Sequence, residues 1–173
     1  CLAWRNQGEP LLAAGDENGN IAILKSGAPP RGLANVPRGV QDLAWSPDGQ
    51  SLAAACTDGT VRIWAISEAP DTEPEVLSAH KGSALSVAWS ANGSRLASGG
   101  YDGTVCIWRP SAAFGPMITH DKGAPLHSLA VSEDGTRIAA GSQHGDIFTW
   151  DAGNNTNSTI WHDGSRVICL AWQ

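Results

Sequence analysis

The chain alternates between short runs of apolar or small residues and short polar turns. In the clearest stretch the runs lie at 85–89, 96–99 and 105–108, and the turns lie at 90–94 and 101–104. The turns contain Asn92-Gly93 and Asp102-Gly103, dipeptides that suit the left-handed backbone of tight hairpins. No segment repeats its apolar residues at the spacing of a helix. The pattern therefore predicts antiparallel β-strands joined by hairpins.

The same arrangement recurs along the chain. The segment at 2–24 returns at 43–64, 87–108 and 129–150. The first run of each unit ends at Trp4, Trp45, Trp89, Val131 and Trp172, at separations of 41, 44, 42 and 41 residues. A fixed period of this length is typical of proteins built from stacked supersecondary units. We expect one domain with units at 1–35, 36–78, 79–118 and 119–160, and 161–173 as the first strand of a fifth.

Each unit is predicted to be a four-stranded antiparallel sheet. A weaker fourth strand is expected around 76–78, 117–119 and 159–161. The first strands are apolar at odd and even positions alike, as in Leu43, Ala44 and Trp45, so both faces of each sheet must be covered. Sheets stacked radially around an axis meet that demand. The predicted fold class is therefore all-β, a β-propeller of four-stranded antiparallel blades.

The unit that runs from His80 to Trp108 resembles the WD repeat, and the resemblance covers essentially the whole chain. In that family a buried hydrogen-bonded set joins a His before the first strand, a Ser or Thr in the second, an Asp in the second turn and a Trp that closes the third. The resemblance gives these structural roles to His80, Ser98, Asp102 and Trp108.

The other units keep only part of this set. The second keeps Asp58 and Trp64 but has Ala54 at the serine position, so we expect Asp58 to contribute less to stability than Asp102. The partial sets of the later units are His120 with Trp150, where Ala140 and His144 replace Ser and Asp, and then His162 alone. The first unit has Asn18 and Leu24 at the Asp and Trp positions.

The chain is expected to be an incomplete fragment of a larger, seven-bladed ring. It opens at Cys1 with no initiator Met and no basic-then-apolar leader, so the rest of the polypeptide is expected to be missing. We expect three strands of one blade, three complete blades, and a lone first strand from His162 onward. Such a chain would form an open arc.

Composition and charge exclude several classes of protein. The net charge is −6, which argues against nucleic-acid binding, and no apolar run approaches the roughly 20 residues of a membrane span. The four cysteines, Cys1, Cys56, Cys106 and Cys169, form no CxxC pair and sit in strand-like runs. They are expected to be small buried hydrophobes of a cytoplasmic protein.

The residues offer little for catalysis. His80, His120 and His162 recur 40 and 42 residues apart, in step with the repeat, which indicates a structural role instead of a metal site. There is no G-x-S-x-G elbow and no phosphate-binding loop. We therefore expect no cofactor, no metal and no enzyme. The alternative is an enzyme-type propeller with an active site in its central funnel.

The resemblance implies a non-catalytic platform for protein–protein interaction. Its partners would be proteins or peptides, and it could be the C-terminal sensor or adaptor part of a larger signalling protein. In an antiparallel blade, the turn between the second and third strands and the loop to the next blade emerge at the same end. The partner-binding residues expected at that end are Glu17, Arg38, Thr57, Lys81, Tyr101, Lys122 and Gln143.

Overall fold

A computed structural model describes residues 1–33, 36–66, 73–78, 80–109, 118–121, 123–151, 156–162 and 164–172. In these ranges the chain forms sixteen strands, which build four separate four-stranded sheets. Every pair of neighbouring strands is antiparallel. The described residues include no helix that could span a membrane. The predicted all-β fold of four-stranded antiparallel blades is confirmed.

The strands of each sheet follow one another in chain order. The first sheet comprises β1 (Leu2–Trp4), β2 (Leu11–Gly15), β3 (Ile21–Lys25) and β4 (Arg31–Gly32). The second comprises β5 (Val40–Trp45), β6 (Ser51–Cys56), β7 (Thr60–Ala65) and β8 (Glu75–Ser78). The third comprises β9 (Ala84–Trp89), β10 (Leu96–Gly100), β11 (Thr104–Trp108) and β12 (Ile118–Asp121). The fourth comprises β13 (Leu126–Val131), β14 (Arg137–Ser142), β15 (Asp146–Asp151) and β16 (Thr156–His162).

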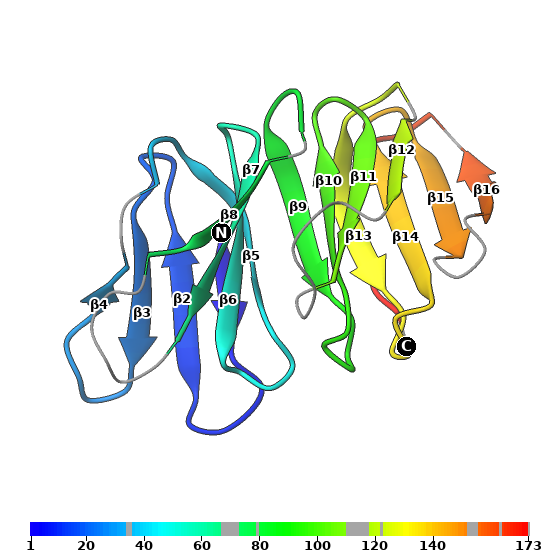
Figure 1. Ribbon diagram of the computed structural model, residues 1–173. Coiled ribbons are helices and arrows are strands. Elements are labelled where there is room, and N and C mark those ends of the chain that lie inside the picture. The colour runs from blue at the N-terminus through cyan, green and yellow to red at the C-terminus, as the bar shows by residue number, and fades with distance from the viewer. Residues whose placement is uncertain are drawn as a thin grey trace.

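Consecutive sheets pack through their first strands. Strand β5 lies against β1 and β2, β9 lies against β5 and β6, and β13 lies against β9 and β10. Strands β5 and β9 are thus contacted by both neighbouring sheets, which is the burial that their two apolar faces require. Among the other described sheets, strand β1 is contacted by the second alone, and its Leu2 and Trp4 are exposed. In Figure 1 the sheets follow one another across the view, from the blue first sheet on the left to the yellow and orange fourth sheet on the right.

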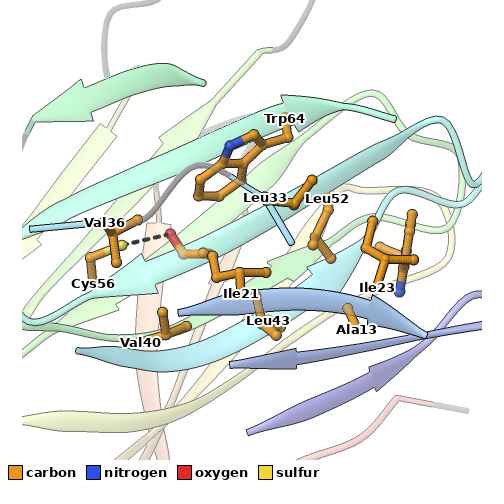
Figure 2. Packing of buried hydrophobic residues seen from close by; sticks show 12 residues of the cluster. Ala13, Ile21, Ile23, Leu33, Val36, Val40, Leu43, Leu52, Cys56 and Trp64 are labelled. Carbon is orange, nitrogen blue, oxygen red and sulfur yellow. Dashed lines mark hydrogen bonds between the residues drawn. The ribbon is translucent and has the colours of Figure 1, made fainter. Parts of the chain in front are cut away.

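Hydrophobic clusters fill the spaces between the sheets. Figure 2 shows the first, in which Ala13 and Ile21 of the first sheet meet Leu43, Leu52 and Trp64 of the second. The other two clusters join the second sheet to the third and the third to the fourth. Fully burying a side chain of leucine size stabilises a fold by about 1.5–3 kcal/mol, so these clusters hold the sheets together.

A repeated hydrogen bond also links the sheets. The indole nitrogen of Trp45 donates to the Ala3 carbonyl at 3.0 Å, and that of Trp89 donates to the Ala44 carbonyl at 3.2 Å. Trp172 makes the same bond to the Ala130 carbonyl at 3.0 Å. Trp45 and Trp89 end the first strands β5 and β9, and each reaches the carbonyl of an alanine in the preceding first strand. Trp172 makes its bond to β13 from a segment that forms no strand. The fourth sheet has Val131 at this position, which cannot donate.

The glycines of the turns between second and third strands also serve the packing of sheets. Gly59 has a φ of 86°, and a Cβ there would lie 2.6 Å from the Gly82 carbonyl oxygen of the following loop. Gly103 has a φ of 75°, and a Cβ there would lie 2.8 Å from the Gly123 nitrogen. Glycine is therefore needed for the backbone conformation and for the close approach of the next segment.

Two expectations about the ends of the chain need correction. The first sheet has four strands and not three, because Leu2–Trp4 pairs antiparallel with residues 12–14 of β2. Residues 164–172 form no strand, since no described strand pairs with them, but they lie along the fourth sheet, where the Val167 amide donates to the Ser142 carbonyl at 3.1 Å. Strands β12 and β16 end at 121 and 162, beyond the expected unit ends of 118 and 160.

The four cysteines differ in burial: two lie in the inner sheets and two lie near the ends of the chain. Cys56 and Cys106 are fully buried, and burial raises the pKa of their thiols to about 11 and about 12. Cys1 and Cys169 are exposed, so the expectation of four buried cysteines is wrong for these two. Both belong to the first and last described segments, where no further sheet covers them.

Candidate functional site

The four sheets share two distinct ends. At one end the chain crosses from each sheet to the next, beside the turns between second and third strands; we call this the crossover end. At the opposite end lie the turns between first and second strands and the connections between third and fourth strands. The third sheet shows how the crossover end is held, because a buried polar network lies beneath it.

The network brings together the four residues predicted from the sequence. His80 Nε2 lies 2.8 Å from Ser98 Oγ, and the Trp108 indole nitrogen donates to the same Ser98 oxygen at 3.2 Å. On the other side of the ring, His80 Nδ1 lies 3.2 Å from Asp102 Oδ1 and 2.9 Å from Thr104 Oγ1. The His80 side chain is fully buried. Sequence reasoning missed Thr104, although it directly follows the Asp-Gly pair.

The donors in this network fix its protonation. The Asp102 carboxylate can only accept, so in the neutral ring Nε2 is left without a hydrogen and accepts from the Ser98 hydroxyl, which in turn accepts from the Trp108 indole. The remaining imidazole proton then sits on Nδ1 and faces Asp102. Burial lowers the pKa of His80, although the Asp102 carboxylate opposes the shift. His80 is therefore neutral at pH 7.

Asp102 joins the network to the crossover loop. Its Oδ2 accepts the Lys81 amide at 2.7 Å, while its Oδ1 accepts the Thr104 hydroxyl at 2.7 Å and the Thr104 amide at 3.1 Å. Burial alone would raise the pKa of Asp102, but these hydrogen bonds outweigh burial and lower it. The ionised carboxylate thus ties the turn that carries it to the loop that enters the third sheet.

The second sheet replaces this network with an ion pair. Asp58 Oδ2 lies 2.9 Å from Nη2 of Arg62, whose side chain is only 10% exposed. Burial would raise the pKa of Asp58, but hydrogen bonds from Thr60 and the charge of Arg62 lower it. Because Ala54 stands at the serine position, the buried Trp64 indole nitrogen has no partner among the described residues. Asp58 thus has a partner that sequence reasoning missed, and its loss would leave a buried guanidinium unpaired; its weight relative to Asp102 stays a prediction.

The fourth sheet has only part of the hydrogen-bonded network seen in the third sheet, and it uses different positions. His162 Nδ1 lies 2.8 Å from Asp146 Oδ1, and Ser142 Oγ donates to Asp146 Oδ2 at 3.2 Å. The His162 side chain is 60% exposed and pairs across β15 and β16. Trp150 is buried beside Phe148, with ring centroids 5.9 Å apart. The side chain of His120 lies outside the described residues.

The structure places the predicted partner-binding residues along the crossover end. Hydrogen bonds join its successive parts: the Thr57 amide donates to the Gly39 carbonyl at 2.9 Å, and Ser83 Oγ donates to the Thr57 carbonyl at 3.2 Å. The Tyr101 amide donates to the Ser83 carbonyl at 2.8 Å. Of the predicted residues, Glu17, Arg38, Lys81, Tyr101 and Gln143 are exposed and Thr57 is half-buried. Lys122 lies outside the described residues.

At the strand positions that an enzyme-type propeller would use, the second sheet has Asp42, which makes structural contacts. Asp42 Oδ2 accepts the Val87 amide of the next sheet at 2.9 Å, and its Oδ1 accepts the Leu43 amide at 2.9 Å. Burial raises the pKa of Asp42 despite these bonds. The corresponding residues of the third and fourth sheets are the buried Ser86 and Ser128. Within the described ranges, no group of three His, Cys, Asp or Glu residues is placed to hold a metal.

The network predicts a stability that depends on pH. Unfolded His80 takes up a proton near pH 6.5, whereas the buried ring resists protonation, so its contribution is complete above that pH and is lost as pH falls toward the lower pKa of the folded state. We expect wild type to lose more free energy of unfolding between pH 7 and pH 5 than the variant His80→Gln. Urea titrations at both pH values measure the difference. Identical losses would show that His80 titrates like an exposed residue.

The ion pair predicts a coupling between two residues. Asp58→Ala should lower the free energy of unfolding by about 3 kcal/mol, because it leaves the Arg62 charge buried and unpaired. Adding Arg62→Leu should restore at least about 1 kcal/mol of that loss. A double-mutant cycle in urea measures this coupling. Losses that simply add would contradict the assigned role of Arg62.

Comparison with known proteins agrees with this architecture. The chain matches the family "WD domain, G-beta repeat" at residues 35–65, 72–109 and 116–151. A 72-residue segment is 33% identical to the Protein LST8 homolog of Drosophila pseudoobscura pseudoobscura. The match covers 40% of this chain and 23% of that relative, so it spans about a quarter of the relative's length. The chain belongs to the WD40 repeat family, whose repeats form protein-interaction scaffolds that are typically non-catalytic.

Proposed function

We propose that this chain is a non-catalytic scaffold that binds a protein or peptide partner at its crossover end, around Tyr101 and Lys81. The observation that carries this proposal is the connection between the buried network and these two exposed residues. Lys81 follows His80, and its amide is held by Asp102 at 2.7 Å, while Tyr101 precedes Asp102 in the turn. The network therefore fixes the backbone on both sides of the exposed pair.

The chemistry of this surface suits a protein partner. Tyr101 is the only tyrosine of the chain and is 61% exposed. It lies beside Gly82, where a Cβ would be 3.5 Å from Tyr101 Cβ, so the loop supports the base of the side chain. Tyrosine is enriched among the residues that dominate interface energies, and a held backbone lowers the entropy lost on binding.

The setting of this scaffold is part of the same proposal. The chain serves as the C-terminal sensor or adaptor part of a larger signalling protein in the cytoplasm, within a larger ring of blades. Buried, unpaired Cys56 and Cys106 support a reducing compartment.

Capture of partners by the full-length protein tests the proposed surface. We expect Tyr101→Ala and Lys81→Ala each to reduce capture several-fold without lowering the melting temperature, because both side chains are exposed. Quantitative mass spectrometry of proteins retained on the immobilised chain measures this effect.

The matched control is Glu73→Ala, an exposed residue in the connection between β7 and β8 at the opposite end. Capture should be unchanged in this variant. A result in which Glu73→Ala abolishes capture and Tyr101→Ala has no effect would place the binding surface at the opposite end.

A further inference from the structure

A pocket of about 300 Å³ lies at the opposite end, between the first and second sheets. It is distant in the fold from the proposed crossover surface, because its walls come from the turn after β1, the ends of β3 and β7, and the connection to β4. A volume of this size is at the lower limit of pockets that bind small ligands or single side chains. We call it the Arg5 pocket.

Its floor is apolar and continuous with the hydrophobic core. Ile23 is 5% exposed and belongs to the core cluster between the first two sheets. Leu11 and Ile66 are partly buried and pack against the same cluster. An aliphatic side chain that entered the pocket would therefore contact an extension of the existing core, without the cost of ordering the floor.

Its rim is cationic. Arg5, Lys25 and Arg31 line the pocket together with one carboxylate, that of Glu9. The Glu9 carboxylate is committed to Lys25, with a distance of 2.7 Å between Nζ and Oε2. Three of the eleven Lys and Arg residues of a chain with net charge −6 thus meet in one hollow.

Arg5 is the cation best prepared for a ligand. Its Nε donates to the Glu9 backbone carbonyl at 2.9 Å, Nη2 donates to the same oxygen, and the guanidinium lies 5.8 Å from the centre of the Trp45 ring. These contacts fix the side chain but do not neutralise it, because no described carboxylate forms a salt bridge with Arg5. A held guanidinium can bind a carboxylate with paired hydrogen bonds at a reduced entropic cost.

We propose that the Arg5 pocket binds an acidic peptide segment that inserts one aliphatic side chain. The aliphatic group would lie on Leu11, Ile23 and Ile66, and flanking carboxylates would pair with Arg5 and Lys25. The apolar floor favours a peptide over a nucleic acid, whose charged backbone would leave that floor uncovered. This site is independent of the proposed crossover surface and would give the scaffold a second place to hold a partner.

Fluorescence polarisation with a labelled peptide of sequence Asp-Glu-Leu-Asp-Glu tests the proposal on the intact chain. Binding should weaken about tenfold when the peptide's acidic residues are replaced by their amides, and about tenfold when its leucine becomes serine. It should also weaken as salt is raised, because the rim charges are exposed. No binding at millimolar protein, equal binding of the neutral peptide, or displacement by single-stranded DNA with higher affinity would overturn the proposal.

Variants of the pocket give changes in opposite directions. Arg5→Gln should weaken binding about tenfold, whereas Glu9→Gln should tighten it several-fold, because it removes the pocket's carboxylate and leaves the backbone acceptor of Arg5 in place. Lys25→Gln provides a second loss variant if Arg5→Gln fails to fold. The matched control is Arg109→Gln. Arg109 directly follows β11, the third strand of the third sheet, so it occupies a position similar to that of Lys25 at the end of β3, but it does not line the pocket.

The control also separates this inference from the proposed function. Arg109→Gln and Lys81→Gln should both leave peptide affinity unchanged. A loss on Lys81→Gln without a loss on Arg5→Gln would place the peptide at the crossover end and overturn the Arg5 site, while the proposed function would survive. If Glu9→Gln binds the peptide more tightly while Tyr101→Ala leaves partner capture unchanged, the Arg5 pocket is supported and the proposed crossover surface is not.

Discussion

The burial of the first strands β5, β9 and β13 between sheets is the constraint on which the rest of the structure depends. A strand such as β5 is apolar on both faces, so its own sheet cannot shelter it and the adjoining sheets must do so. Apolar contact alone does not fix how one first strand is aligned with the next. The hydrogen bonds from the Trp45 and Trp89 indoles to carbonyls of the preceding first strand fix that alignment. Because adjoining sheets must cover the first strands, the sheets stack one after another. In that stack the equivalent turns and loops of successive sheets lie at the same end.

The shared crossover end allows each sheet to use different chemistry beneath a similar surface. The third sheet holds its turn with a neutral histidine and an ionised aspartate, whereas the second holds the corresponding turn with Asp58 and Arg62. Both arrangements bury a carboxylate whose pKa is lowered by hydrogen bonds or charge, so both keep the turn fixed at neutral pH. This chain accommodates both arrangements because each of them holds the turn in place.

Much of the fold could be predicted from periodicity, since the hairpin turns and apolar runs recur at a nearly constant spacing. The roles of Ser98 and Trp108 could also be predicted, through the resemblance of their unit to the WD repeat. The role of Arg62 could not, because a buried arginine in a third strand has no sequence signature until its neighbour Asp58 is placed beside it. The exposure of Cys1 and Cys169 depends on which sheets cover them, and the Arg5 pocket joins residues from two sheets, so neither follows from local pattern.

The exchange of indole protons with solvent tests the dependence of the fold on sheet-to-sheet contact most directly. In a nitrogen-15 spectrum assigned with single Trp→Phe variants, the indole protons of Trp45 and Trp89 should exchange slowly, because each is bonded to the carbonyl of the preceding sheet. Trp4 is 64% exposed at the same position of the first sheet, so its indole proton should exchange at the rate of an unprotected group. Equal exchange rates at Trp4, Trp45 and Trp89 would contradict the account.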